Sequence, residues 1–158
     1  MIPPVGTFGL VHTNGRAATA IRLATLARVN HAFLVVDDRT IIEANPDGVD
    51  TRPLDEYDHV AWSHRAIPLT AWQGTQVAGF ARTRLGDAYN WPGIAALGFD
   101  HFLGWRPAWL DDRANQPTTW FCSQLVVAAY RFAGIDLTPG KPDWTVSPGD
   151  LSEVLLYR

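Results

Sequence analysis

The sequence is poor in cysteine, in lysine and in uninterrupted apolar runs. Its one cysteine, Cys122, cannot form a disulfide within the chain, so the fold does not depend on an oxidising compartment. Of the thirteen basic residues only Lys141 is lysine, the net charge is −3, and there is no run of like charges. Without a basic patch the chain has no electrostatic means of holding a polyanion, so we expect no nucleic-acid partner.

Long apolar segments are also missing. No stretch approaches the roughly 18 apolar residues of a membrane span, and residues 1–6 lack the basic start and apolar run of a secretion signal. We therefore expect no integral membrane segment and a cytoplasmic location. With 158 residues, 47% apolar and 18% charged, the chain is expected to form a single domain over residues 1–158.

The first half of the chain predicts an antiparallel sheet. Two apolar stretches, His31–Val36 and Thr40–Ala44, flank the polar triplet 37–39 and are typical of a hairpin. Further strands are expected at 5–11, at 49–57 as an edge interrupted by proline, and at 60–68, with a helix at 16–29.

The second half predicts helices around an irregular segment. Apolar spacing indicates a helix over 69–86 with Gly86 as its C-cap, and another that Thr118 and Thr119 cap and that ends at Gly134. Residues at about 89–117, rich in Gly, Pro and Trp, are expected to form an irregular aromatic-rich insertion. The last apolar run is short, at 154–157. The expected fold is α+β, with about five or six antiparallel strands packed against the cysteine-bearing helix and one or two others.

Cys122 stands near the start of its predicted helix, and this position favours nucleophilic chemistry. Unpaired N–H groups and the positive end of the helix dipole stabilise a thiolate, which is the nucleophilic form of cysteine. The N–H groups of Cys122 and Ser123 are also placed to stabilise the oxyanion of a tetrahedral intermediate. The apolar face of the helix is expected to comprise Phe121, Leu125, Ala128, Ala129 and Phe132.

A cysteine nucleophile needs a base, and the chain has five histidines. Only His31 opens a predicted core strand, where a sheet can hold an imidazole rigidly. If residues 37–39 form a three-residue loop, His31 lies opposite Asn45 and Glu43 becomes its diagonal neighbour on the same face. Glu43 is then placed to orient the imidazole, whereas a two-residue loop would turn it to the opposite face.

Each of these residues also has a purely structural interpretation. A lone cysteine near a helix start is most often a buried small hydrophobe, and a lone histidine is usually structural. Glu43 in an apolar strand either faces water or has a partner. The histidines lack paired ligand spacing and one cysteine supplies too few soft ligands, so no metal or other cofactor is expected.

Several motifs occur together in one order along nearly the whole chain. They are the helix segment 20–25, Asn30-His31-Ala32, Ile42-Glu43-Ala44, Gly48-Val49, Pro53-Leu54 with Tyr57, Leu85-Gly86 with Tyr89, the segment 121–126, and the segment 147–151. With these motifs the sequence resembles the circularly permuted branch of the NlpC-type papain-like superfamily, the YiiX/YaeF-like amidases. In that branch the histidine strand precedes the cysteine helix, as it does here.

The resemblance implies a papain-like fold with Cys122 as nucleophile, His31 as base and Glu43 as the orienting group. Tyr89 would either line the site or be a tyrosine that serves only in packing. The implied substrate is an amide or isopeptide bond of the cell-wall-peptide kind, which would require a phage-encoded protein or another delivery route. Two departures are visible: Gly6-Thr7 stands where the family usually has Gly-Asp, and the aromatic segment 97–110 has no family role.

Two other functions stay open at this point. Relatives of this superfamily use the same cysteine and histidine on lipids. On this alternative the protein would be a lipid acyl-ester or thioester hydrolase, or an acyltransferase. Its aromatic insertion would suit the apolar tail of a lipid substrate. The second alternative is a non-catalytic binding or structural protein on the same scaffold. The sequence predicts no oligomeric state.

Overall fold

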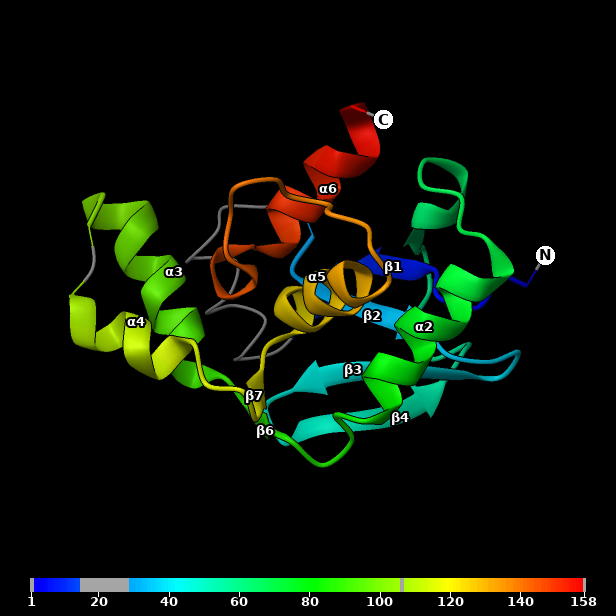
Figure 1. Ribbon diagram of the computed structural model, residues 1–158, viewed down its shortest axis with the longest axis horizontal. Coiled ribbons are helices and arrows are strands. Elements are labelled where there is room, and N and C mark those ends of the chain that lie inside the picture. The colour runs from blue at the N-terminus through cyan, green and yellow to red at the C-terminus, as the bar shows by residue number, and fades with distance from the viewer. Residues whose placement is uncertain (1, 15–28, 106, 158) are drawn as a thin grey trace.

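An antiparallel sheet with a buried helix on one face forms the centre of the molecule, in a computed structural model that describes residues 2–14, 29–105 and 107–157 (Figure 1). The five strands have the order β4-β3-β2-β1-β5, and all neighbours are antiparallel. They are β1 (Phe8–Val11), β2 (His31–Val35), β3 (Thr40–Asn45), β4 (Gly48–Pro53) and β5 (Ala61–Trp62). The expected α+β class is confirmed.

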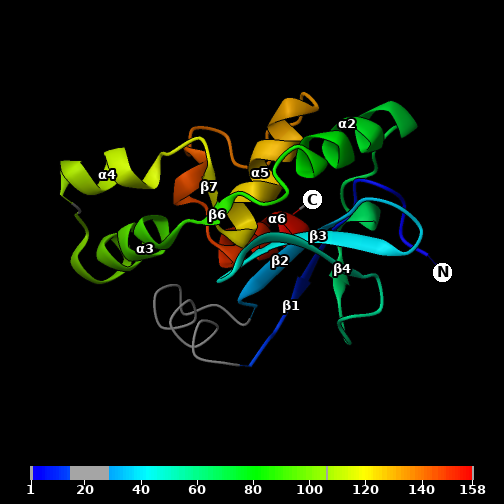
Figure 2. The same cartoon turned by 90° about the horizontal axis from the view of Figure 1, so that it is seen from below.

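Helices α5 (Cys122–Phe132) and α2 (Ala71–Arg82) lie on the same face of the sheet (Figure 2). The other described elements are α3 (Trp91–Leu103), α4 (Ala108–Ala114), α6 (Pro148–Tyr157), the 3-10 helices Ser63–Arg65 and Asp143–Thr145, and a small parallel sheet of β6 (Ala88–Tyr89) and β7 (Thr119–Trp120). These are more helices than the one or two expected beside α5. The helix predicted at 16–29 falls almost entirely outside the described residues.

The β2–β3 hairpin has the register that a three-residue loop requires. Phe33 lies opposite Glu43, and the N–H of Val36 donates to the carbonyl of Thr40 at 3.0 Å. Because side chains alternate between the two faces of a strand, this register places Glu43 on the same face as His31. Of the two loop lengths that the sequence left open, the three-residue loop is the one present.

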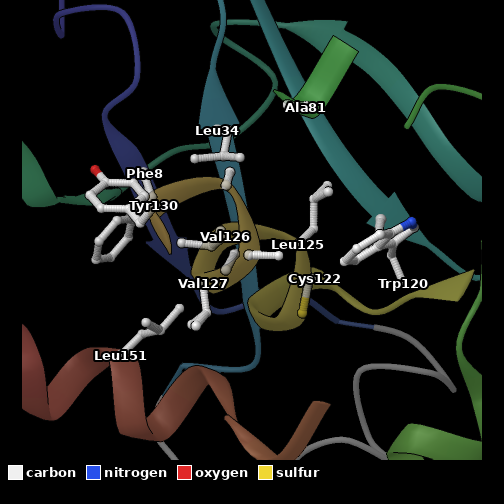
Figure 3. Close-up of a cluster of buried hydrophobic side chains, with 14 of the residues drawn as sticks. Phe8, Leu34, Ala81, Trp120, Cys122, Leu125, Val126, Val127, Tyr130 and Leu151 are labelled. Atoms are coloured by element: carbon white, nitrogen blue, oxygen red, sulfur yellow. The ribbon is translucent and has the colours of Figure 1, made fainter. Parts of the chain in front are cut away.

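The sheet is buried on both faces. Ala32, Leu34 and Val36 pack in the large core with α5, while Phe33 and Val35 pack in a smaller cluster with the side chains of Tyr57, Val60 and Trp62. α5 is buried from Cys122 to Tyr130, as Figure 3 shows for part of this core. The expectation for Phe132 was wrong, because its side chain is 59% exposed.

Two helix boundaries differ from the prediction. α5 begins at Cys122 with Phe121 as its N-cap, because Thr119 pairs with Ala88 in the small sheet instead of capping the helix. α2 ends at Arg82, and Gly86, with φ of +86°, lies in the following loop, where its N–H donates to the carbonyl of Val49 at 2.9 Å. Gly86 therefore joins this loop to the sheet rather than capping α2.

Three strand or tail predictions also change. The strand expected at 60–68 is only β5, because Ser63 begins a 3-10 helix and accepts a hydrogen bond from the N–H of Phe8 at 2.9 Å. The strand expected at 5–11 starts at Phe8, since Gly6 has φ of +86°. The apolar run at 154–157 belongs to α6.

The segment at about 89–117 is not irregular: it forms the helical hairpin of α3 and α4. Pro92 stands in the first turn of α3, where a missing N–H costs nothing, and the side chain of Asn90 caps this helix by accepting from the N–H of Gly93 at 2.8 Å. Ala96 and Leu110 are buried where the two helices pack against each other. The high content of Gly, Pro and Trp hid this helical pattern.

Candidate active site

The fold brings three predicted residues together. His31 is the first residue of β2, Glu43 lies on β3, and Cys122 is the first residue of α5, which packs against both strands. The Nε2 atom of His31 lies 2.8 Å from Oε2 of Glu43, and the Cys122 side chain is close enough to the His31 ring to raise its pKa. Since Nε2 is engaged by Glu43, Nδ1 is the ring nitrogen left for the sulfur.

All three side chains are shielded from solvent. The exposed fraction is 1% for Cys122, 2% for Glu43 and 8% for His31. Figure 3 shows Cys122 beside Leu125 at the end of α5. Cys122 is thus a buried residue, as its structural interpretation requires, but it also has an imidazole as its neighbour.

Glu43 is held by three more side chains. The hydroxyl of Tyr57 donates to Oε2 at 2.7 Å, the Asn45 amide donates to Oε1 at 3.4 Å, and Nε of Arg52 lies 3.5 Å from Oε1. Tyr57 also packs its ring edge-on against His31, with 5.6 Å between the ring centroids. The carboxylate is therefore fixed in position, and through it the imidazole.

Burial and charge shift the pKa values of the pair in opposite directions. Burial lowers the pKa of His31, but hydrogen bonds and charge from Cys122 and Glu43 outweigh it and raise the pKa to about 10. Burial raises the pKa of Glu43, but His31, Tyr57 and Asn45 outweigh it and lower the pKa to about 2. At neutral pH the site therefore favours an imidazolium beside a carboxylate.

A buried amide network anchors the N-terminus of α5. Asn90 donates to Oε1 of Gln124 at 2.8 Å and to the carbonyl of Ala114, while the same Gln124 oxygen accepts from the N–H of Phe121 at 3.3 Å. Asn90 is fully buried and Gln124 is 3% exposed. This network ties α3, the end of α4 and the first turn of α5 together around Cys122.

The two predicted lining residues are in different situations. Ser123 is fully buried and its hydroxyl donates to the carbonyl of Val146 at 2.7 Å, so this hydroxyl is used to hold the segment before α6. Tyr89 is 7% exposed, and burial together with the negative charge of Cys122 raises its pKa above the ordinary value. Tyr89 is therefore close enough to Cys122 to feel its charge.

Four residues to which the sequence analysis gave no role contribute to the site: Tyr57, Arg52, Asn90 and Gln124. Arg52 contacts Glu43 from the strand β4, and Tyr57 contacts it from the loop after β4. These contacts depend on the pairing of β3 with β4, which the sequence pattern did not indicate. Asn90 carried a usable signal, because an asparagine two residues before a proline is typical of a helix start. Gln124 had a comparable signal as the third residue of its helix.

The described residues contain neither a metal-binding cluster nor a membrane-spanning helix. Within residues 2–14, 29–105 and 107–157, no three His, Cys, Asp or Glu side chains are grouped in a way that would hold a metal ion. In that part of the chain, no helix has both the length and the apolar character of a membrane span.

Comparison with known proteins gives one informative similarity. No protein-family model matches the chain. The chain is similar to the probable lipoprotein peptidase YaeF of Escherichia coli (strain K12), with 26% identity over 162 residues and 87% of this chain covered. It spans 58% of the length of that relative.

Proposed function

We propose that the chain is a cysteine hydrolase that cleaves an amide or isopeptide bond through Cys122, His31 and Glu43. The observation that carries this proposal is the placement of His31 between Cys122, which raises its pKa, and Glu43, with Nε2 and Oε2 2.8 Å apart. An imidazole held from both sides in this way has the geometry that an activated nucleophile needs. The similarity to a probable peptidase supports the same class of reaction.

In the first half of the reaction, the Cys122 thiolate attacks the carbonyl carbon and a carbon–sulfur bond forms. The His31 imidazolium then donates its proton to the leaving nitrogen, and the carbon–nitrogen bond breaks. In the second half, His31 accepts a proton from water, which attacks the acyl-enzyme. The carbon–sulfur bond breaks and the thiolate is restored beside a protonated His31. Glu43 keeps its charge throughout and stabilises the imidazolium.

The oxyanion of each tetrahedral intermediate would be stabilised at the start of α5. Cys122 and Ser123 are the first two residues of this helix, so their N–H groups have no acceptor within it. Tyr89, close to Cys122, is suited to line the same space. The oxyanion role expected from the helix start, and the lining role considered for Tyr89, are thus compatible with the positions of these residues.

For the substrate, we favour a peptide amide of the cell-wall kind, on the circularly permuted NlpC-type resemblance of the sequence. The second candidate is a lipid acyl ester or thioester. It is favoured by the Trp91 side chain, which is 49% exposed and packs against Tyr89 with 4.9 Å between the ring centroids. Turnover of a panel of dipeptide amides and acyl esters separates the two, because turnover of esters alone would exclude the amidase.

Alkylation tests the nucleophile without knowledge of the substrate. His31 stabilises the Cys122 thiolate. We therefore expect iodoacetamide to label Cys122 at about pH 6 at least about tenfold faster in the unmodified chain than in the His31→Ala variant. The His64→Ala variant is the matched control and should react like the unmodified chain, since His64 lies in a 3-10 helix away from this pair. Equal labelling rates for His31→Ala and the unmodified chain would contradict the proposed pair.

Removal of the sulfur tests catalysis itself. We expect Cys122→Ala to abolish turnover of amides and esters while the chain stays folded, because alanine keeps the apolar part of a small buried side chain. Circular dichroism and a thermal melt measure the fold. Retained turnover in this variant would favour the non-catalytic interpretation of the scaffold.

A further inference from the structure

The α3–α4 hairpin ends in a strongly apolar tip. Four large apolar side chains, which we call the aromatic tip, are exposed here: Phe102 by 62%, Leu103 by 56%, Trp105 by 58% and Trp109 by 58%. Figures 1 and 2 both show α3 and α4 at one end of the molecule, extending away from the sheet and α5. This placement leaves the tip free to meet a flat surface before the rest of the molecule does.

The buried cluster of the hairpin is formed by other side chains. This cluster consists of Ala96, Leu110 and Ala114 together with Trp144 from the 3-10 helix Asp143–Thr145, and Phe99 packs against it. Trp105 contacts Phe99 edge-on, with 6.3 Å between the ring centroids, yet more than half of its surface remains exposed. Exposed apolar groups gathered in this way mark an interaction surface rather than a requirement of folding.

We propose that the aromatic tip inserts into the interfacial layer of a lipid bilayer with zwitterionic headgroups. Tryptophan favours this layer, because its ring is apolar while its N–H remains able to bond to polar groups. Two of the four side chains are tryptophan. Over residues 102–109 the sequence has one charged residue, Arg106, so insertion of the segment desolvates little charge.

The charges beside the tip select the type of lipid. The described neighbours Asp100, Asp111 and Asp112 are acidic, and Arg113 is the basic side chain among them, with its guanidinium 5.8 Å from the Trp109 ring. A surface drawn to anionic lipids would need a cluster of basic residues, which this sequence lacks. The apolar side chains therefore drive the contact, and neutral headgroups suit it.

The same hairpin relates the bilayer to Cys122. The base of α3 is fixed to α5 by the hydrogen bond from Asn90 to Gln124. With thirteen residues, α3 has a length of about 20 Å. Insertion of the tip would thus hold the start of α5 about one helix length from the membrane surface. At that distance Cys122 could reach molecules that are attached to the membrane.

Flotation with vesicles tests this proposal. We expect the chain to float with phosphatidylcholine vesicles, with no gain from added phosphatidylglycerol and no loss at high sodium chloride. The double variant Trp105→Ser, Trp109→Ser should partition into the vesicles at least about tenfold less. The matched control is Trp72→Ser, because Trp72 is 64% exposed but lies on α2, at the other end of the molecule. Circular dichroism of each variant measures its folding.

Three results would overturn the proposal. One is failure of the unmodified chain to float with either vesicle, and another is equal flotation of the double variant and the Trp72→Ser control. The third is flotation that needs phosphatidylglycerol and disappears in salt. Analytical ultracentrifugation identifies the competing partner: concentration-dependent dimers that the double variant loses, without flotation, would assign the tip to a second copy of the chain. None of these measurements depends on catalysis.

Discussion

The Glu43 carboxylate accepts hydrogen bonds from His31, Tyr57 and Asn45, and Arg52 forms an ion pair with it. A buried carboxylate without such partners would lose its charge, because burial alone raises its pKa. Here the partners lower the pKa to about 2. The charge that remains on Glu43 is one of the causes that raise the pKa of His31 to about 10.

The pH dependence of turnover follows from this coupling. His31 must carry a proton to release the amine, so kcat/KM should fall only as the pH rises through about 10. Glu43→Gln removes the negative charge and lowers the pKa of His31, so the fall should begin at least about one pH unit lower. A pH profile measures this, with the exposed Glu153→Gln as the matched control. An alkaline limb unchanged in Glu43→Gln would show that Glu43 does not act on His31.

At this scale the sequence predicted two residues of the site from position and the third from register. Glu43 was identified because a three-residue loop sets which side chains share a face, and the structure has that register. The neighbours Tyr57 and Arg52 could not be predicted in the same way. They meet Glu43 only after β4 has paired with β3 and the following loop has crossed the sheet, which no local pattern describes.

Among the elements, α2 is positioned by a close backbone contact. A Cβ atom added at Gly74 would lie 2.4 Å from the carbonyl oxygen of Val5, which is closer than real contacts allow. The N-terminal segment therefore passes against α2 only because residue 74 has no side chain. Gly79, in the same helix, has no atom within 4 Å of its added Cβ.

These two glycines form a matched pair of substitutions. Gly74→Ala should destabilise the chain by about 1–3 kcal/mol, because the backbone of the N-terminal segment must move away from α2. Gly79→Ala should stabilise it by about 1 kcal/mol, since alanine is the better helix former and nothing is displaced. Urea unfolding measures both. Destabilisation of similar size in both variants would argue against the close approach of residue 5 to α2.

Element boundaries were predicted well where a local sequence pattern sets them. They were predicted poorly where contacts with residues distant in the sequence set them. The β2–β3 hairpin follows from its turn residues and is present, and the edge strand expected at 49–57 is present as β4 but ends at Pro53. The strand expected at 60–68 is short because Ser63 bonds to Phe8 across the sheet. The hairpin of α3 and α4 was missed because its helical spacing is interrupted by Gly, Pro and Trp, and because its buried cluster is completed by Trp144 from a distant part of the chain.

For the whole molecule, the ionised pair couples stability to pH. The folded pKa of Glu43, about 2, lies below its ordinary value of 4.5. The resulting stability is present above the ordinary pKa and is lost as the pH falls through the folded one. Protonation of Glu43 therefore weakens the ion pair between Glu43 on β3 and His31 on β2.

Acid unfolding checks this coupling. Between about pH 7 and about pH 3, the free energy of unfolding of the unmodified chain should fall by about 2 kcal/mol more than that of Glu43→Gln. The variant starts from a lower stability but has no carboxyl group to protonate at this position. Urea unfolding at the two pH values gives both differences, with Glu153→Gln as the control. Parallel losses in the unmodified chain and Glu43→Gln would mean that other groups dominate the acid response.

The sequence alone determined the α+β class, the central hairpin, and Cys122 and His31 as candidates for the proposed chemistry, with Glu43 as the third on condition of a three-residue loop. These features follow from side-chain periodicity, turn length and the rarity of cysteine, which are local properties of the chain. The tertiary structure alone decided that Cys122 meets His31, that Tyr57 and Arg52 hold Glu43, and that four apolar side chains stand exposed at the end of α3 and α4. These are contacts and exposures of residues far apart in the sequence, and they exist only once the elements have packed together.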